Sequence, residues 1–285
     1  MEGQQHNTLK MLLILLVAIA SLIVIWNEVQ YRFGFDSYYP QGNYEGSDFP
    51  VVSYAAPGCN VADVFFFGDL YTFYESGPES ERISVSADSL MYYLGEAEAT
   101  PNIEVIVLEI DSYGGSPTAA YEVVQMMNEV VTKPIIVQVR EAADSAAYWI
   151  ASAGDVIFAT EVSEVGSLAV TYSYVGESGA NAREGKIFYE LSTGEFKDSG
   201  NPAKALTESE YEMFQRDLDI IHNVFVKSVA ENRGLQIEEV RTLADGSVML
   251  GEMAKEKGLI DEVGSFEEVD QYIRDTYGIE PVRCW

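Results

Sequence analysis

The stretch of sequence that decides the fold lies at residues 103–117 and reads IEVIVLEIDSYGGSP. Its first nine residues are rich in β-branched side chains without polar alternation, which is typical of a central strand of a parallel sheet. The pair Gly114 and Gly115 predicts a turn, and Pro117 is well placed in the first turn of a helix that we expect to reach about Val131. Strand, glycine turn and helix in this order indicate a unit of an α/β fold.

The same alternation continues outward from this unit. Strands are expected at residues 61–68, 134–139, 155–162 and 167–174, and helices after residue 86, at 145–153, at 208–232, after residue 250 and at 266–276. Thr207 and Glu210 form a capping-box signature before the longest helix, and Gly234 closes it. Ser86 or Asp88 is expected to cap the helix that follows residue 86. Alternating strands and helices predict an α/β class with a largely parallel sheet.

Composition limits the classes of function. The chain has 285 residues, of which 47% are hydrophobic, as in globular proteins. Its formal net charge of −29, from 46 acidic and 17 basic residues, disfavours nucleic acid and anionic membrane surfaces as partners. The two cysteines, Cys59 and Cys284, leave a disulfide open, because sequence does not give the distance between them. No C-x-x-C pair is present, so we expect no metal site and no cofactor.

The N-terminal region carries an apolar run at residues 11–26, MLLILLVAIASLIVIW. We expect a tail at 1–10, a transmembrane signal anchor at 11–29, a linker at 30–59 rich in Tyr, Gly, Ser and Pro, and an α/β domain at 60–285. A cleaved signal peptide is the alternative. Flanking basic residues do not fix the orientation. The acidic bulk favours a single-pass protein of the cell membrane whose domain lies outside the cytoplasm.

The candidate nucleophile is Ser145, in the stretch EAADSAAYWIASAGD at residues 141–155. It follows a predicted strand by a short segment, so it belongs at the carboxyl edge of the sheet, near Gly115. At a helix N-terminus, the backbone N–H groups of Gly115 and Ala146 form a candidate oxyanion hole. The alternative is that Asp144 or Ser145 simply caps the helix.

A serine nucleophile needs a base. His222 lies within the long predicted helix, where a packing role is favoured over a Ser-His-Asp triad. A serine–lysine pair is the other variant, and it requires a neutral lysine, which burial favours. Seven lysines follow the apolar run, and Lys197 stands beside an aromatic residue in the polar stretch STGEFKDSGNPAKALT at 192–207. A solvated surface lysine is the alternative for Lys197 taken alone.

Four motifs in order resemble the signal peptide peptidase A family of membrane-anchored serine proteases. They are IDSYGGSPTAA at 110–120, KPIIVQVREAADSAAYWIASAGDVIFATEVSEVGSLAV at 133–170, FKDSGNPAKALTESE at 196–210 and DGSVMLGEMAKEKGLIDEVGS at 245–265. The resemblance implies a crotonase-like, Clp protease-like fold with a repeated ββα core. It places the nucleophile at Ser145 and the base at Lys197. It also implies a ring-like homo-oligomer in which serine and lysine meet across subunits.

Two segments depart from the family pattern. Tyr113 stands where the family usually has proline, and Asp144-Ser145-Ala146-Ala147 stands where it usually has Ala-Ser-Gly-Gly. Tyr113 and Gly114 are the candidate substrate-binding residues. The predicted function is a membrane-anchored endopeptidase that cleaves peptides such as remnant signal peptides or damaged membrane and exported proteins.

Two other functions stay open at this point. Asp144 and the acidic composition motivate a pseudo-protease that acts as a membrane-anchored, peptide-binding scaffold. An acyl-CoA enzyme of the crotonase fold is disfavoured, because neither its acidic catalytic residue nor a basic site for the CoA phosphates is recognisable.

Overall fold

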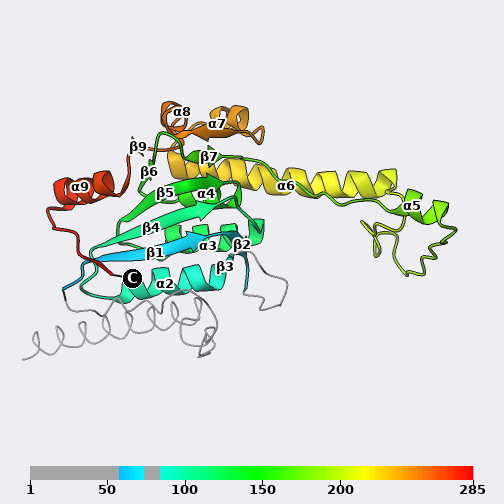
Figure 1. Ribbon diagram of the computed structural model, residues 1–285, viewed down its shortest axis with the longest axis horizontal. Helices are drawn as coiled ribbons and strands as arrows, with labels where there is room; N and C mark the ends of the chain where they lie inside the picture. Colours follow the sequence, from blue (N-terminus) through cyan, green and yellow to red (C-terminus); the bar gives the residue numbers. More distant parts are fainter. Residues whose placement is uncertain (1–57, 74–83, 285) are drawn as a thin grey trace, which may run out of the picture. The chain divides into compact units, whose positions relative to one another are not determined.

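A computed structural model describes residues 58–73 and 84–284 (Figure 1). Its main sheet has the strand order β10-β1-β4-β5-β6-β9, with β7 paired to β5 and β8 paired to β7. All of these pairings are parallel except that between β7 and β8. The predicted α/β class with a largely parallel sheet is therefore confirmed.

The strands are β1 Val61–Phe67, β2 Asp69–Tyr71, β3 Ser84–Ser86, β4 Val105–Ser112, β5 Ile135–Asp144, β6 Val156–Ala159, β7 Glu164–Gly166, β8 Val248–Leu250, β9 Glu262–Val263 and β10 Arg283–Cys284. The helices are α2 Ala87–Ala99, α3 Pro117–Glu129, α4 Ala146–Ala151, α5 Ser178–Arg183, α6 Glu208–Arg233, α7 Ile237–Leu243, α8 Gly251–Glu256 and α9 Phe266–Tyr277.

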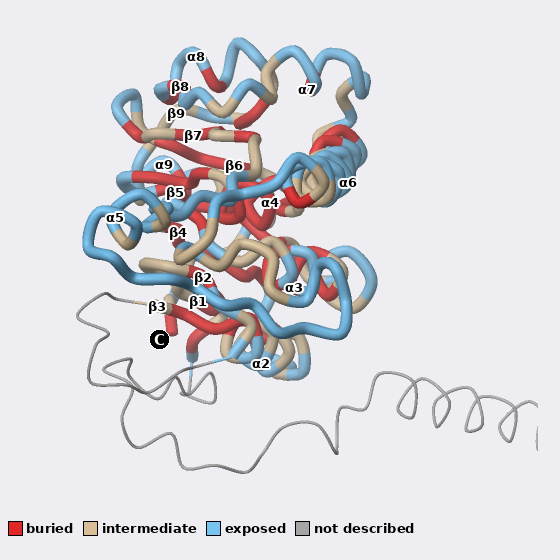
Figure 2. Tube along the Cα trace, turned by 90° about the vertical axis from the view of Figure 1, so that its right-hand side faces the viewer, coloured by how far each residue is buried: buried red, intermediate tan, exposed pale blue. Residues whose placement is uncertain are grey.

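Helices lie on both faces of the main sheet (Figures 1 and 2). Alternate residues of β1, β4 and β5 point into a large core shared with α2, α3, α4 and α6. The other alternate set, including Val107 and Ile136, packs with Val269 and Ile273 of α9 in a smaller core. Because period-two alternation sends successive side chains to opposite faces, apolar residues on both faces of β4 require this double cover.

Local signals in the sequence placed several helix ends. Thr207 and Glu210 form the reciprocal capping box at the start of α6, and Gly234 ends the helix in the left-handed conformation. The side chain of Ser86 caps α2. The two cysteines form a disulfide with a Cα–Cα distance of 5.8 Å, which links β10 to Cys59, two residues before β1.

One predicted strand is wrong, and another is longer than predicted. Residues 167–174 are not a strand, because Ser167 adopts a φ of 51° and turns the chain away from the sheet. The alternating apolar residues of this segment serve other contacts, with Leu168 in the core and Tyr172 against Phe214 of α6. The strand predicted at 134–139 continues to Asp144, where its last residues pair with β7.

Residues 169–207, called the arm below, connect β7 to α6 and include α5. No residue of the arm is buried. Figure 1 shows α5 and its loops around the N-terminal end of α6, beyond the sheet. The predicted transmembrane segment lies outside the described residues, and none of the helices that the structure does describe is long and apolar enough to cross a bilayer.

Candidate active site

The backbone at Ser145 is in an unusual conformation. Its φ of 53° and ψ of −120° lie in a region that residues other than glycine rarely adopt, at a cost of about 1–3 kcal/mol. Two hydrogen bonds hold it, from the Ser145 N–H to the Gly166 carbonyl at 2.8 Å and from the Trp149 N–H to the Ser145 carbonyl at 3.0 Å. Strain of this kind is typical of functional sites.

Capping does not explain this serine. Ser145 occupies the N-cap position of α4, but its side chain forms no capping hydrogen bond. The side chain of Asp144 also forms no hydrogen bond to a partner in the described part of the chain. The sequence alternative that either residue caps the helix is therefore wrong, and the Ser145 hydroxyl is left available for another role.

The glycine turn lies against this serine, as the sequence predicts. A Cβ built on Gly114 would lie 3.0 Å from Cβ of Ser145 and 3.1 Å from the backbone nitrogen of Ala146. Gly115 is equally restricted, because a Cβ there would lie 2.2 Å from the carbonyl oxygen of Leu70. Both glycines have positive φ values, 112° and 149°, which other residues rarely adopt.

Hydrogen bonds fix the turn and leave donors beside the serine. Leu70 of β2 donates its N–H to the Gly114 carbonyl at 2.9 Å and accepts from the Ser116 N–H at 2.8 Å. Within residues 58–73 and 84–284, the N–H groups of Gly115 and Ala146 donate to no protein acceptor. The two donors predicted for an oxyanion hole are therefore not used by the described chain.

Helix α4 gives the serine a rigid support. The Tyr148 hydroxyl donates a hydrogen bond to the Leu259 carbonyl at 2.8 Å from within the core. The Trp149 ring stacks on Phe225 of α6, with ring centroids 4.7 Å apart. Because both side chains lie in the core, α4 has little freedom to tilt, and Ser145 keeps a fixed position relative to the glycine turn.

Asp144 is an unpaired acid beside the nucleophile. The residue is only 5% exposed, and its Oδ1 atom is buried without a hydrogen-bond partner in the described part of the chain. Burial and, secondarily, the charge of Glu164 raise the pKa of Asp144 to about 6. The carboxylate is therefore ionised at neutral pH at an energetic cost.

Lys197 lies in the arm and is exposed. Its ammonium forms neither a hydrogen bond nor an ion pair with any described residue of its own chain. Figure 1 shows the arm at the far end of α6 from the junction of β5 and α4, where Ser145 lies. One copy of the chain therefore brings Ser145, Gly114, Gly115 and Ala146 together and leaves Lys197 apart.

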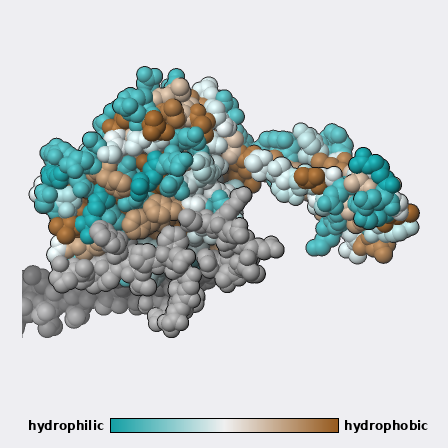
Figure 3. Space-filling model, in the orientation of Figure 1, coloured by the Kyte–Doolittle hydropathy of each residue, from teal (hydrophilic) through white to brown (hydrophobic). Residues whose placement is uncertain are grey.

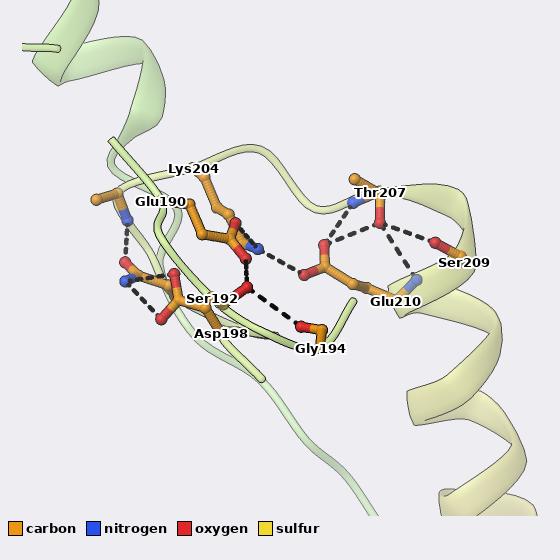
Figure 4. A network of polar contacts seen from close by, with 10 residues as sticks. Glu190, Ser192, Gly194, Asp198, Lys204, Thr207, Ser209 and Glu210 are labelled. Atoms are coloured by element: carbon orange, nitrogen blue, oxygen red, sulfur yellow. Dashed lines mark hydrogen bonds and ion pairs between the residues drawn. The ribbon is translucent and has the colours of Figure 1, made fainter. Parts of the chain in front are cut away.

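Lys204, on the same arm, differs sharply from Lys197. Its ammonium contacts Glu190 at 2.7 Å and Glu210 at 3.0 Å (Figure 4). Both carboxylates hold the pKa of Lys204 above its usual value. Glu210 also accepts a hydrogen bond from the Thr207 N–H, so Lys204 ties the arm to the capping box of α6. This lysine is structural, and it stays charged.

The two remaining candidates have simple environments. His222 packs in α6 with its Nε2 atom 3.3 Å from the Leu168 carbonyl oxygen, which agrees with a packing role. Tyr113 is 62% exposed beside the glycine turn, and its hydroxyl donates to Glu141 at 3.5 Å. Glu164 and Leu70 were missed by sequence reasoning, because only their strand pairing brings them to the site.

Comparisons with known proteins agree with this architecture. The sequence matches the family described as peptidase family S49 over residues 129–280 and the family described as Clp protease over residues 80–165. A protein named as a protease in Methanocaldococcus jannaschii is 30% identical over 216 residues, which cover 74% of this chain and 68% of the relative.

Two further relatives are longer than the region they share with this chain. A protein named as signal peptide peptidase SppA in Enterococcus faecium is 30% identical over 58% of this chain and 49% of the relative. Protease 4 of Haemophilus influenzae is 28% identical over 67% of this chain and 31% of the relative. The match therefore spans about two thirds, half and a third of the three relatives.

Proposed function

The chain belongs to peptidase family S49, and from this premise we propose that it is a membrane-anchored serine endopeptidase with a Ser145–Lys197 dyad. The family resemblance in the four sequence motifs is confirmed by this membership, and so is the Clp protease-like fold. The single observation that carries the dyad's nucleophile is the strained, uncapped Ser145 held against the glycine turn.

In the proposed reaction, Ser145 Oγ attacks the carbonyl carbon of a peptide bond while neutral Lys197 Nζ accepts the hydroxyl proton. The backbone N–H groups of Gly115 and Ala146 stabilise the resulting oxyanion. Collapse breaks the C–N bond, and the lysine ammonium gives its proton to the leaving amine. Water then hydrolyses the acyl-enzyme, with Lys197 again accepting a proton.

A second copy of the chain supplies the lysine in this proposal. The arm that carries Lys197 buries no residue of its own, yet it exposes a series of large apolar side chains (Figure 3). Leu191, for example, is 97% exposed. An arm with so much exposed apolar surface is typical of a segment that packs against another subunit. Burial there favours the neutral lysine that the reaction needs.

Residues 11–29 would anchor this assembly in the cell membrane, with residues 30–59 as a linker and residues 60–285 as the peptidase domain outside the cytoplasm. Anchoring places the site near the bilayer, where remnant signal peptides and damaged membrane or exported proteins are the available substrates. An extended peptide would bind by pairing its backbone with a strand edge.

The test is turnover of a quenched fluorescent peptide by the full chain in detergent. Ser145→Ala and Lys197→Met are each expected to lower kcat by about a thousandfold or more. The matched control is Lys186→Met, which removes another arm lysine whose ion pair with Glu184 is solvent-exposed. Turnover at the wild-type rate in both Ser145→Ala and Lys197→Met would refute the mechanism.

Mixing the two inactive variants tests the subunit arrangement. Ser145→Ala subunits still offer Lys197, and Lys197→Met subunits still offer Ser145. If the dyad forms between copies, co-assembly of the two restores part of the activity. If both residues come from one copy, the mixture stays as inactive as its components.

The alternative function is a catalytically impaired scaffold that binds peptides at the membrane. The unpartnered carboxyl of Asp144 beside the nucleophile is the observation that favours it. A serine-directed fluorophosphonate probe separates the two functions. Labelling that is lost in Ser145→Ala supports the peptidase, whereas an unlabelled wild-type chain supports the scaffold.

A further inference from the structure

The carboxyl edge of the sheet carries acidic side chains on the face that α9 packs against. Ala142 and Asp144 are two residues apart in β5, so their side chains lie on the same face of the sheet. Ala142 pairs with Glu164 of β7, so Glu164 lies on that face too. The residues between them in the register, Ala143 and Val165, point into the opposite core.

Two more acids reach the same edge. Ser112 pairs with Ala143, so Asp111 faces the side of the sheet that Asp144 faces. Glu141 accepts the hydrogen bond from Tyr113. The charges of Glu141, Glu164 and Asp111 raise the pKa of Tyr113, so these three carboxylates lie on the same side of the glycine turn as its ring. Asp111, Glu141, Asp144 and Glu164 are called the acidic rim below.

The acidic rim has no basic partner. Across residues 58–73 and 84–284, none of its four carboxylates forms an ion pair. Arg140 lies in the same strand, β5, but pairs with Glu109 instead. Asp144, 5% exposed with a buried and unpartnered oxygen, is the group that most needs a cation. A buried carboxylate is normally satisfied by a hydrogen-bond donor, and a charged donor satisfies it best.

The carboxylates do not form a site for a bare metal ion, since no three acidic, histidine or cysteine side chains in the described chain converge as metal ligands do. Exposed apolar side chains lie among the carboxylates instead: Tyr113, Val248 at 42% and Leu250 at 48%. Val248 and Leu250 are brought to this face by pairing with Gly166 and Glu164. Apolar surface beside carboxylates fits the aliphatic stem and charged head of lysine or arginine.

We propose that the acidic rim is a subsite for a lysine or arginine side chain of the peptide substrate, next to the bond that Ser145 cleaves. This inference rests on the proposed peptidase function and deepens it by naming a class of substrate. The net charge of −29 acts in the same direction, because it attracts cationic peptides to the site from a distance.

The test measures binding and cleavage separately, with peptides that differ only in arginine against citrulline, its neutral counterpart of equal shape. Each residue flanking an alanine-rich scissile bond is varied in turn. Full-length Ser145→Ala in detergent is expected to bind the arginine peptide about fivefold more tightly at the position that reaches the rim. Raising NaCl to about 0.5 M is expected to reduce that preference, because salt screens exposed charges.

Variants locate the preference. Glu164→Gln and Asp144→Asn, each added to Ser145→Ala, are expected to bring the two dissociation constants closer together. Glu129→Gln is the matched control, since it removes the same charge at the far end of α3 from the glycine turn. Equal binding of arginine and citrulline peptides at every position would overturn the subsite, and so would a preference that both rim variants retain.

Cleavage by the wild-type chain keeps the two proposals apart. Cleavage of both peptides at equal rates, together with equal binding, removes the subsite and leaves the peptidase. A binding preference for arginine without any cleavage supports the rim and refutes the peptidase function.

Discussion

The sheet face that α9 packs against has two halves that treat carboxylates differently. In the half beneath Phe266, called the covered half, each buried acid meets an arginine: Asp63 pairs with Arg283 at 2.6 Å, and Glu109 pairs with Arg140 at 3.0 Å. Both guanidinium groups also lie over the Phe266 ring. At the acidic rim, by contrast, the described chain offers no cation to any of the four carboxylates.

The two halves also differ in how neighbouring charges change the pKa of the buried acid. Burial raises the pKa of Asp63 to about 7, and the attraction of Arg283 opposes that rise. Burial also raises the pKa of Asp144, but there the nearest charge, Glu164, adds to the rise. A paired buried charge is typical of structure, whereas an unpaired one beside a cleft is typical of a functional site.

The largest effect is expected from the disulfide that holds β10, the strand that carries Arg283. Replacing both members of the Cys59–Cys284 disulfide by alanine should lower the free energy of unfolding by about 3–5 kcal/mol, because the bond closes a loop with a sequence separation of 225. Denaturant unfolding of the full chain in detergent measures this loss. Reduction of the wild type should reproduce it, and reduction of the double variant should change nothing. An unchanged denaturation midpoint would show that β10 is held without the disulfide.

The next effect concerns the arginine of the covered half. Arg283→Met should cost about 2–3 kcal/mol at pH 8, because it removes the guanidinium that faces the buried carboxylate of Asp63 at 2.6 Å. The folded-state pKa of Asp63 lies above its unfolded value, so the folded state holds the proton more tightly and stability falls as pH rises from about 4 through 7. Without Arg283 that pKa rises further, so the loss relative to wild type should be smaller at pH 5.5 than at pH 8.

A double variant isolates this pair. Asp63→Asn together with Arg283→Met removes both charges, and it should recover part of the stability that Arg283→Met loses. Equal losses in the single and double variants, at both pH values, would mean that Arg283 acts through its contact with Phe266 or Asp270 rather than through Asp63.

Sequence reasoning succeeded where the signal is local. The limits of α6 follow from Thr207, Glu210 and Gly234, which act within one turn of the helix ends. Sequence reasoning failed where a residue far away in the sequence determines the local structure. The charged residues after Val139 indicate a loop, but pairing with Glu164 of β7 keeps them in β5. The disulfide was left open for the same reason, since only the tertiary fold brings its cysteines together.

The candidate site divides in the same way. Gly114, Gly115 and Ser145 were placed together because parallel strands bring their carboxyl ends to one edge. The positive φ of Ser145 was not predictable, because the close contact between the turn and the end of β5 imposes it. In the proposed dyad, a second copy of the chain sets the position of Lys197 relative to Ser145, and the sequence of one chain does not place that copy.

A smaller effect of opposite sign is expected at the rim. Asp144→Asn should raise the free energy of unfolding by about 1–2 kcal/mol at pH 7.5, because it removes a buried charge. The folded-state pKa of about 6 exceeds the unfolded value, so the wild type loses stability as pH rises from about 4 through 6. Thermal unfolding should therefore show almost no gain at about pH 3, where the carboxyl is mostly protonated in both states. A gain of equal size at both pH values would point to packing instead of charge.

The smallest effect separates the two causes of the raised Asp144 pKa, which are burial and the charge of Glu164. Glu164→Gln removes the neighbouring charge, so the pH midpoint of the stability gain from Asp144→Asn should shift downward by less than about one unit, because the folded-state pKa of Asp144 falls toward its usual value. The measurement is the pH midpoint of the stability difference between chains with and without Asp144→Asn, each in the Glu164→Gln background. The folded-state pKa is lower in that background, so less of the cost of ionisation remains, and the plateau gain above pH 7 should also shrink.

Glu129→Gln should leave midpoint and plateau where they are in the wild type. If Glu164→Gln leaves them there too, burial alone sets the ionisation of Asp144, and the rim does not act as one electrostatic unit.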